Sequence, residues 1–215
     1  MTDKITLFYS PQTRAATMLV LAEELGAEYE LHEINMKAGE QRSETYLQIN
    51  PLGKVPAVRH NNAVVTEQVA IYIYLADLFP AAGLAPAIGD SLRASYLRWL
   101  VYYAACYEPA LVDRALKREP APHAMCPYGD FDEMLATITA PIAAGPYLLG
   151  EKFSAADLLW GQGLRLGAMF GILPKNPVIE AYVERVTSRP SFKKVAELDG
   201  KMAERHAAVA AGKTL

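Results

Sequence analysis

The chain has 215 residues, of which 52% are hydrophobic and 21% are charged, a composition that is typical of a globular protein and excludes a disordered one. Its formal net charge of -3 at pH 7 argues against nucleic acid as the principal partner. No apolar run approaches the roughly 18 residues of a membrane-spanning helix, and the N-terminal MTDK lacks a secretory h-region. We therefore expect a cytoplasmic protein that does not bind a membrane.

The first third of the chain is predicted to be an α/β domain. Residues 14–25 have apolar side chains at a helical period, and Gly26 is a suitable residue for the end of that helix. Asn61 and Asn62 separate two short apolar runs, and asparagine tolerates the positive φ of a tight hairpin turn. The expected elements are a strand, a helix, a strand, a short helix, two hairpin strands and a helix, over residues 4–9, 14–25, 29–34, 40–47, 57–59, 63–66 and 67–78.

The rest of the chain is predicted to be all-helical. Residues 80–89 are rich in proline, glycine and alanine, so we interpret them as a linker. Ser154 and Asp157 have the spacing of a capping box, and Pro141 should kink or end the helix that contains it. The expected helices cover about residues 91–116, 131–144, 158–170, 177–188 and 191–208. The predicted domains are an α/β domain, a linker and an all-α domain, over residues 1–79, 80–89 and 90–215.

The cysteines and histidines give no indication of a disulfide or metal framework. Cys106 and Cys126 are too few and too far apart in sequence for a disulfide scaffold, so we expect two reduced thiols. The four histidines are scattered without the spacing of metal ligands, so no metal site is predicted.

Residues 50–77 carry the strongest indication of a binding site. Pro56 lies where a strand would otherwise run, and a proline inside a sheet belongs at an edge, a strand start or a bulge. A cis peptide bond there would turn the backbone of Val55 outward, so that its N–H and C=O could pair with an extended ligand. Glu67 and Gln68 precede an apolar helix whose first N–H groups would attract a carboxylate. One peptide-like, anionic ligand could satisfy both places.

Four motifs of the chain resemble those of cytosolic glutathione S-transferases. The first is ITLFYSPQTR at residues 5–14. The second is NPLGKVPAV at residues 50–58 together with the pair EQ at residues 67–68. The third and fourth are FSAAD at residues 153–157 and RPSF at residues 189–192. Each motif alone has little specificity, but together they occur in the expected order and cover nearly the whole chain. The resemblance implies a thioredoxin-like N-terminal domain that binds glutathione, followed by an all-α domain, in a cytoplasmic homodimer. It also implies glutathione as the co-substrate, without a metal, and detoxification as the role.

A glutathione transferase requires a group that stabilises the thiolate of glutathione. A free thiol with a pKa of about 8.5 is only a few per cent ionised at neutral pH, and a hydroxyl that donates a hydrogen bond to the sulfur lowers that pKa. Residues 9–14 contain no cysteine and three hydroxyls, which we rank in the order Ser10, Thr13 and Tyr9. Ser10 ends the strand and stands where serine-type members of the family have their hydroxyl. Plain helix capping is the alternative role for Ser10 and Thr13.

The other ligand contacts are implied by the resemblance. Lys54 would pair with the glycine carboxylate of glutathione, and Val55 and Pro56 would hold its peptide backbone. Glu67 would pair with the α-amino group, and Gln68, which stands where the family more often has serine, would help to hold the α-carboxylate. A solvated loop lysine and a favourable acidic first helical turn are the alternative readings of Lys54 and Glu67.

An aromatic helix is expected to provide the pocket for the electrophile, between the two domains. Tyr103 and Tyr107 share one helix face at i, i+4 spacing and are the candidates for its lining. Core packing is the alternative for both rings.

The sequence therefore predicts a glutathione transferase that delivers the glutathione thiolate to a small apolar electrophile. A glutathione-dependent isomerase or peroxidase would use the same thiolate. A glutathione-binding or regulatory protein that keeps the fold without turnover is the alternative from another class.

Overall fold

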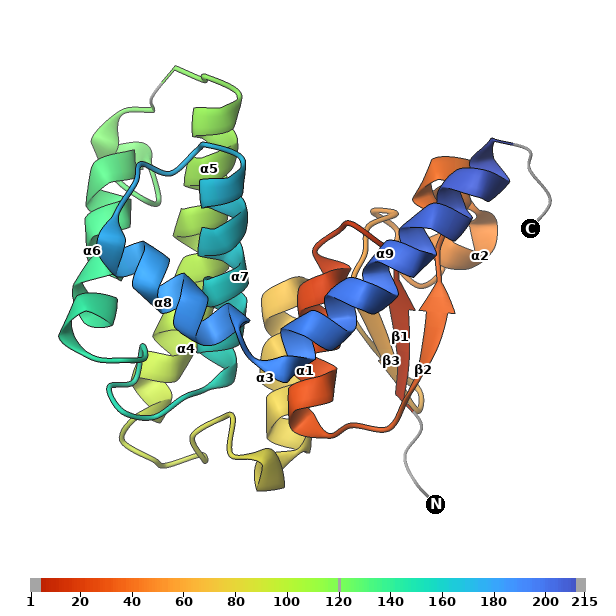
Figure 1. Cartoon of the computed structure of the whole chain (residues 1–215), viewed down its shortest axis with the longest axis horizontal. Coiled ribbons are helices and arrows are strands. Elements are labelled where there is room, and N and C mark those ends of the chain that lie inside the picture. Colours follow the sequence, from red (N-terminus) through yellow and green to blue (C-terminus); the bar gives the residue numbers. More distant parts are fainter. Residues whose placement is uncertain (1–4, 120, 212–215) are drawn as a thin grey trace. The chain divides into compact units, whose positions relative to one another are not determined.

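The structure, a computed structural model, describes residues 5–119 and 121–211 (Figure 1). The chain divides into two compact units. Unit 1 consists of the chain up to Ala82 together with the chain from Arg189 onward, and unit 2 runs from Gly83 to Ser188.

Unit 1 is a thioredoxin-like four-stranded mixed sheet with helices. Its elements are β1 (Ile5–Tyr9), α1 (Ala15–Leu25), β2 (Tyr29–Glu33), η1 (Met36–Ala38), η2 (Glu40–Arg42), α2 (Glu44–Leu47), β3 (Ala57–His60), β4 (Ala63–Val65), α3 (Gln68–Leu78), η3 (Pro80–Ala82) and α9 (Pro190–Ala210). The strand order is β2-β1-β3-β4, with β1 parallel to β2, and β3 antiparallel to both β1 and β4. All five residues of β1 are buried, which explains why this inner strand has a nearly continuous apolar sequence instead of an alternating one.

Local signals set the ends of these elements. Gly26 adopts a φ of 63° at the C-terminus of α1, the left-handed conformation that glycine tolerates best. Asn61 adopts a φ of 54° in the two-residue turn between β3 and β4, as the hairpin prediction required. The last helix of the α/β region was expected from Glu67, but α3 begins at Gln68, because Glu67 has a φ of 64° and cannot continue a right-handed helix.

Unit 2 is helical, and its described residues form only isolated bridges instead of strands. Its elements are α4 (Arg93–Tyr102), η4 (Tyr103–Tyr107), α5 (Glu108–Ala115), η5 (His123–Met125), α6 (Phe131–Ala144), α7 (Ala155–Met169) and α8 (Pro177–Thr187). The sequence predicted one helix over residues 91–116, whereas the structure inserts the π-helical turn η4 between α4 and α5. Pro109 lies in the first turn of α5 and has no N–H to donate, so a widened turn before it is a physical reason for the change of helix type.

The core of unit 2 is built around Trp160. Its indole N–H donates a 2.9 Å hydrogen bond to the carbonyl of Trp99, and its ring packs 5.2 Å from Tyr103 and 4.9 Å from Tyr107, measured between ring centroids. Gly163 of α7 allows this packing, because a Cβ there would lie 2.4 Å from a ring carbon of Tyr103.

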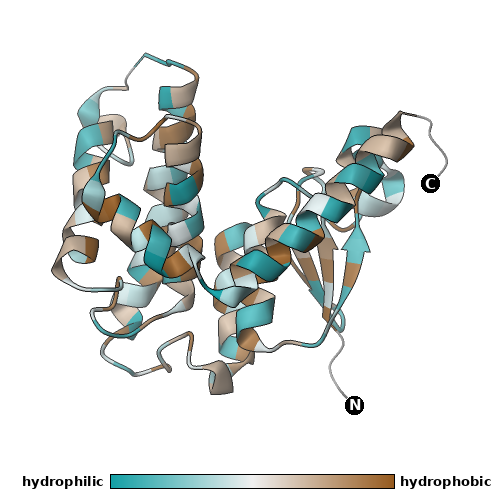
Figure 2. Ribbon diagram, in the orientation of Figure 1, coloured by the Kyte–Doolittle hydropathy of each residue, from teal (hydrophilic) through white to brown (hydrophobic). Residues whose placement is uncertain are grey.

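The C-terminal helix α9 packs with the sheet of unit 1, whereas the prediction assigned all of residues 90–215 to the all-α domain. In Figure 1 α9 runs beside α1, and the two helices are in contact. Arg189 pairs with Glu24 at 2.6 Å at one end of α9, and Arg205 pairs with Glu33 at 2.7 Å near the other end. Figure 2 shows hydrophilic and apolar residues alternating along α9. None of the helices in the described part of the chain combines the length and apolar character that a bilayer crossing needs.

Candidate functional site

Three segments of unit 1 that carry predicted site residues meet at one end of its strands. The antiparallel pair of Phe8 and Ala57 brings the end of β1 beside the start of β3. The antiparallel pair of Val58 and Val65 brings the end of β4 to the same end of the sheet. The turn after β1, the loop before β3 and the segment between β4 and α3 are therefore neighbours, as the sequence prediction of one shared site requires.

The turn after β1 is closed by its own side chain. The Thr13 hydroxyl donates a 2.7 Å hydrogen bond to the carbonyl of Ser10 and accepts a 3.1 Å hydrogen bond from the N–H of Ala15. Gln12 has a φ of 58°, a conformation that is uncommon for residues other than glycine. Thr13 thus closes the turn directly before α1, whose N-cap residue is Arg14, and this structural role needs no ligand.

Asp199 of α9 holds the same turn from outside. The hydroxyl of Tyr9, which is fully buried at the end of β1, donates a hydrogen bond to Asp199 Oδ1. The N–H of Gln12 donates to the same carboxylate, with N–O distances of 3.0 Å to Oδ1 and 3.2 Å to Oδ2. Burial is the main reason why the pKa of Tyr9 lies far above its ordinary value, and the hydrogen bond and charge of Asp199 raise it further. The phenol therefore keeps its proton.

The hydrogen bonds of the turn distinguish the three candidate hydroxyls. A hydroxyl has one proton to donate. The protons of Tyr9 and Thr13 are used by Asp199 and by the carbonyl of Ser10. The Ser10 side chain is buried, and its hydroxyl makes no hydrogen bond with any other described residue. Ser10 therefore has the one proton of the three that remains available to a ligand.

The loop before β3 is fixed by two side chains. The hydroxyl of Tyr46 and the side-chain amide of Asn50 donate hydrogen bonds of 2.7 Å and 2.9 Å to the carbonyl of Lys54. The peptide bond between Val55 and Pro56 is cis. The backbone N–H and C=O of Val55 have no hydrogen-bond partner within residues 5–119 and 121–211. The side chain of Lys54 is exposed, as a contact to a ligand carboxylate would require.

The start of α3 leaves backbone donors open. The first bond of this helix joins the N–H of Ile71 to the carbonyl of Glu67, so the N–H groups of residues 68–70 precede the helical ladder. Glu67 is exposed, and the amide oxygen of Gln68 is buried without a partner among the described residues. This helix N-terminus has the partial positive charge that suits a carboxylate.

Tyr103 and Tyr107 lie in the core of unit 2. Tyr103 is 5% exposed and Tyr107 is fully buried, with its hydroxyl donating a 2.8 Å hydrogen bond to the carbonyl of Gly163. Burial raises the pKa of Tyr107 well above its ordinary value. Core packing, the alternative role for both rings, accounts for these contacts without a ligand.

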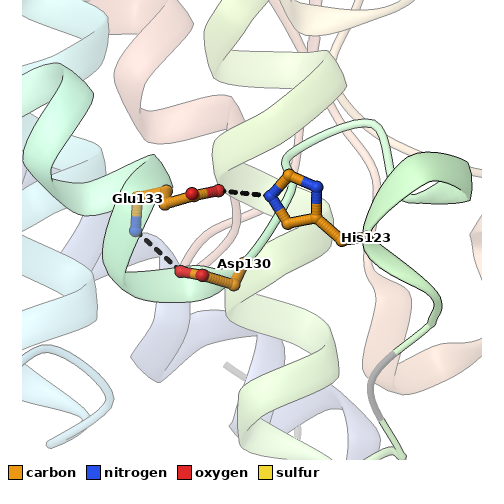
Figure 3. Close-up of side chains that lie close together, drawn as sticks. All are labelled: His123, Asp130 and Glu133. Atoms are coloured by element: carbon orange, nitrogen blue, oxygen red, sulfur yellow. Dashed lines mark hydrogen bonds and ion pairs between the residues drawn. The ribbon is translucent and has the colours of Figure 1, made fainter.

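A histidine with two carboxylates forms the group in the described residues that most resembles a metal site. Ligand atoms of His123, Asp130 and Glu133 lie within 4.8 Å of one another. A hydrogen bond joins His123 and Glu133 (Figure 3); the distance from Nε2 to Oε2 is 2.6 Å, whereas two ligands of a tetrahedral zinc ion would lie about 3.4 Å apart. In the structure these two side chains thus bind each other directly. The pair fastens the loop before α6, and its hydrogen bond raises the pKa of His123.

Comparison with known proteins identifies the family. The family model for the glutathione S-transferase N-terminal domain matches residues 3–77. The glutathione S-transferase-like protein gedE of Aspergillus terreus is 32% identical over an alignment of 157 positions, which covers 66% of this chain and 69% of that protein. The chain belongs to the glutathione S-transferase family.

Solved glutathione transferases share the fold over both units. The crystal structure of a glutathione transferase from Methylococcus capsulatus matches with a TM-score of 0.77 and 28% identity, over 91% of this chain and 98% of that one. A sphingomonad glutathione S-transferase complexed with glutathione matches with a TM-score of 0.73 and 27% identity, also over 91% and 98% of the two chains. These similarities confirm the predicted fold, in which a thioredoxin-like sheet is followed by a helical region.

Two residues of the turn environment were missed from the sequence. Gln12 has no side chain that signals a left-handed conformation, and Asp199 is one of several acidic residues in an amphipathic helix. Asp199 lies 190 residues from Tyr9 in the chain, so no local pattern could connect the two.

Proposed function

We propose that this protein is a glutathione transferase that activates the thiol of glutathione for attack on a small apolar electrophile. Membership of the family and the likeness to a structure complexed with glutathione support glutathione as the co-substrate. By resemblance to the family, we also propose a cytoplasmic homodimer with a role in detoxification.

The observation that carries the proposal is the free proton of Ser10 beside two sets of open backbone groups. Ser10 follows β1, Val55 precedes β3 and Gln68 begins α3, and all three positions lie at the same end of the sheet. In the proposed complex, the backbone of Val55 pairs with the peptide of glutathione. The N-terminus of α3, with Glu67 and Gln68, holds its α-amino acid end, Lys54 meets its glycine carboxylate, and the Ser10 hydroxyl donates to the sulfur.

The required stabilisation is within the range of such contacts. Lowering the thiol pKa by about 2 units, from its ordinary value of about 8.5, takes about 2.7 kcal/mol of preferential stabilisation of the thiolate. A hydrogen bond to a charged acceptor contributes roughly 1.5–3 kcal/mol. One donated hydroxyl could therefore supply most of the effect.

The test combines calorimetry with an ultraviolet titration of the bound thiol. We expect glutathione to bind and its thiol pKa to fall clearly below the solution value of about 8.5. Binding with an unchanged pKa would instead indicate a glutathione carrier or regulator, and the absence of binding would refute the proposed function.

A further inference from the structure

Asp199 contacts the two residues that flank the Ser10–Pro11 step. Its carboxylate accepts from the Tyr9 hydroxyl on one side and from the Gln12 N–H on the other. All of these residues belong to unit 1. A single side chain of the C-terminal helix thus bridges the end of β1 and the turn into α1.

Several other contacts also hold α9 against the rest of unit 1. At its N-terminal end, Arg189 makes two hydrogen bonds to Glu24, of 2.9 Å and 2.6 Å, and Lys194 pairs with Glu23 at 2.6 Å. Nearer its C-terminus, Arg205 pairs with Glu33 at 2.7 Å. The apolar face of α9 is buried at Phe192, Val195, Met202 and Ala203. These contacts hold both ends of α9, whereas the hydrogen bonds of Asp199 go to the end of β1 and to the turn.

The turn contains a backbone conformation that the carboxylate of Asp199 stabilises. Gln12 carries a side chain at a φ of 58°, which is sterically unfavourable outside glycine. A hydrogen bond from its N–H to an ionised carboxylate is stronger than one to a neutral acceptor. The contact therefore stabilises the backbone of Gln12 in this conformation, in addition to the hydrogen bonds of Thr13 within the turn.

We propose that Asp199 is a positioning residue that fixes the β1–α1 turn and thereby aims the Ser10 hydroxyl at the glutathione sulfur. This inference rests on the proposed function. It assigns a part of the active site to the C-terminal helix, through a residue that does not itself touch glutathione.

Positioning and simple charge have opposite effects on the bound thiol. A carboxylate near a thiolate disfavours the thiolate, so removing its charge alone would lower the thiol pKa. Loss of the turn geometry would raise the thiol pKa, because the Ser10 hydroxyl would no longer donate to the sulfur. Asp199→Ala removes both the charge and the acceptors, whereas Asp199→Asn removes the charge and keeps one acceptor oxygen.

The experiment measures the thiol pKa of bound glutathione and the glutathione affinity in both variants. We expect Asp199→Ala to raise that pKa by about one unit, a tenfold fall in the ionisation constant of the bound thiol, while the affinity changes less. Asp199→Asn should stay closer to the wild-type pKa. The matched control is Glu197→Ala, which removes the same charge from an exposed position two residues earlier and should leave the pKa unchanged.

A double variant separates positioning from loss of stability. Asp199→Ala leaves the buried Tyr9 hydroxyl without its acceptor, which destabilises the fold by itself. In Tyr9→Phe/Asp199→Ala both partners are gone, so stability should recover while the thiol pKa stays raised. Faster hydrogen exchange at the Gln12 amide in the same variant, without glutathione, would report the loosened turn.

Two outcomes would overturn the inference while the proposed function stands. One is a thiol pKa that is lowered or unchanged in Asp199→Ala although the wild type lowers it relative to free glutathione. The other is a wild-type pKa in the double variant. A wild-type protein that binds glutathione without lowering its thiol pKa would overturn the proposed function, and this inference with it.

Discussion

Replacing Asp157 should strongly destabilise unit 2. Its side chain is fully buried and accepts four hydrogen bonds. Oδ1 accepts from the N–H of Leu148 at 2.8 Å and from the hydroxyl of Tyr182 at 2.9 Å. Oδ2 accepts from both the N–H and the hydroxyl of Ser154, each at 2.9 Å. The capping box predicted at the start of α7 is thus also the link between α7, α8 and the loop before them.

The magnitude follows from the number and burial of these contacts. Hydrogen bonds to a charged group contribute roughly 1.5–3 kcal/mol each, but part of this total offsets the cost of burying the carboxylate. The pKa of Asp157 is raised above its ordinary value, because the effect of burial is larger than the opposing effect of the hydrogen bonds that the carboxylate accepts. Removing the carboxylate leaves four buried donor groups without their acceptor, and an unsatisfied buried donor costs about 1–3 kcal/mol, so we expect about 4 kcal/mol for Asp157→Ala.

Asp130→Ala is the matched control. Asp130 caps α6 through a 2.8 Å hydrogen bond from the N–H of Glu133, but it lies at the surface, where a lost N-cap costs about 1 kcal/mol. Both tryptophans, Trp99 and Trp160, belong to unit 2, so tryptophan fluorescence follows the unfolding of this unit. With a urea m-value of about 2 kcal/mol/M, the midpoint should fall by about 2 M for Asp157→Ala and about 0.5 M for the control. Equal shifts in the two variants would refute the reasoning.

Two further predictions concern close packing in α7 and the start of α9. Gly163→Ala should destabilise unit 2 by about 1–3 kcal/mol in urea denaturation, because the new Cβ would lie 2.4 Å from the ring of Tyr103. Gly200→Ala is the control and should stabilise α9 by about 0.5–1 kcal/mol, because no atom lies within 4 Å of its new Cβ. Destabilisation by both variants would contradict the packing argument. Burial alone would raise the pKa of Glu24, but hydrogen bonds from Arg189 and Ser191 outweigh it and lower that pKa. The contribution of Glu24 is therefore full above the ordinary carboxylate pKa of about 4.3 and is lost as pH falls further. Glu24→Gln should cost about 2 kcal/mol at neutral pH, measured by circular dichroism, and a difference from wild type that persists unchanged in acid would contradict the assignment.

Local signals in the sequence predicted much of the fold. Gly26 and the Asn61-Asn62 turn set element ends as expected, and the capping box of Ser154 and Asp157 forms at the start of α7. The π-helical turn before Pro109 was missed, because the side-chain period on both sides of it is compatible with one continuous helix. The packing of α9 with the sheet domain depends on contacts such as that of Arg189 with Glu24, which no local pattern reveals.

The candidate site was predictable as a set of segments but not as a network. The order of strands and turns brings the residues around Ser10, Val55 and Gln68 to one end of the sheet. The ranking of the hydroxyls rested on position along the chain, whereas the structure supplies the hydrogen bonds that occupy Tyr9 and Thr13. The roles of these residues toward glutathione stay predictions.

The most direct test of the central claim is the thiol pKa of bound glutathione in wild type and in three single variants of the β1–α1 turn. We predict a pKa clearly below about 8.5 in wild type and a return toward that value in Ser10→Ala, with the glutathione affinity nearly retained. Thr13→Ala and Tyr9→Phe should have smaller effects on the thiol pKa. In wild type the Thr13 hydroxyl already donates to the carbonyl of Ser10, and the Tyr9 hydroxyl already donates to Asp199. An unchanged thiol pKa in Ser10→Ala would contradict the account and move the role to another donor.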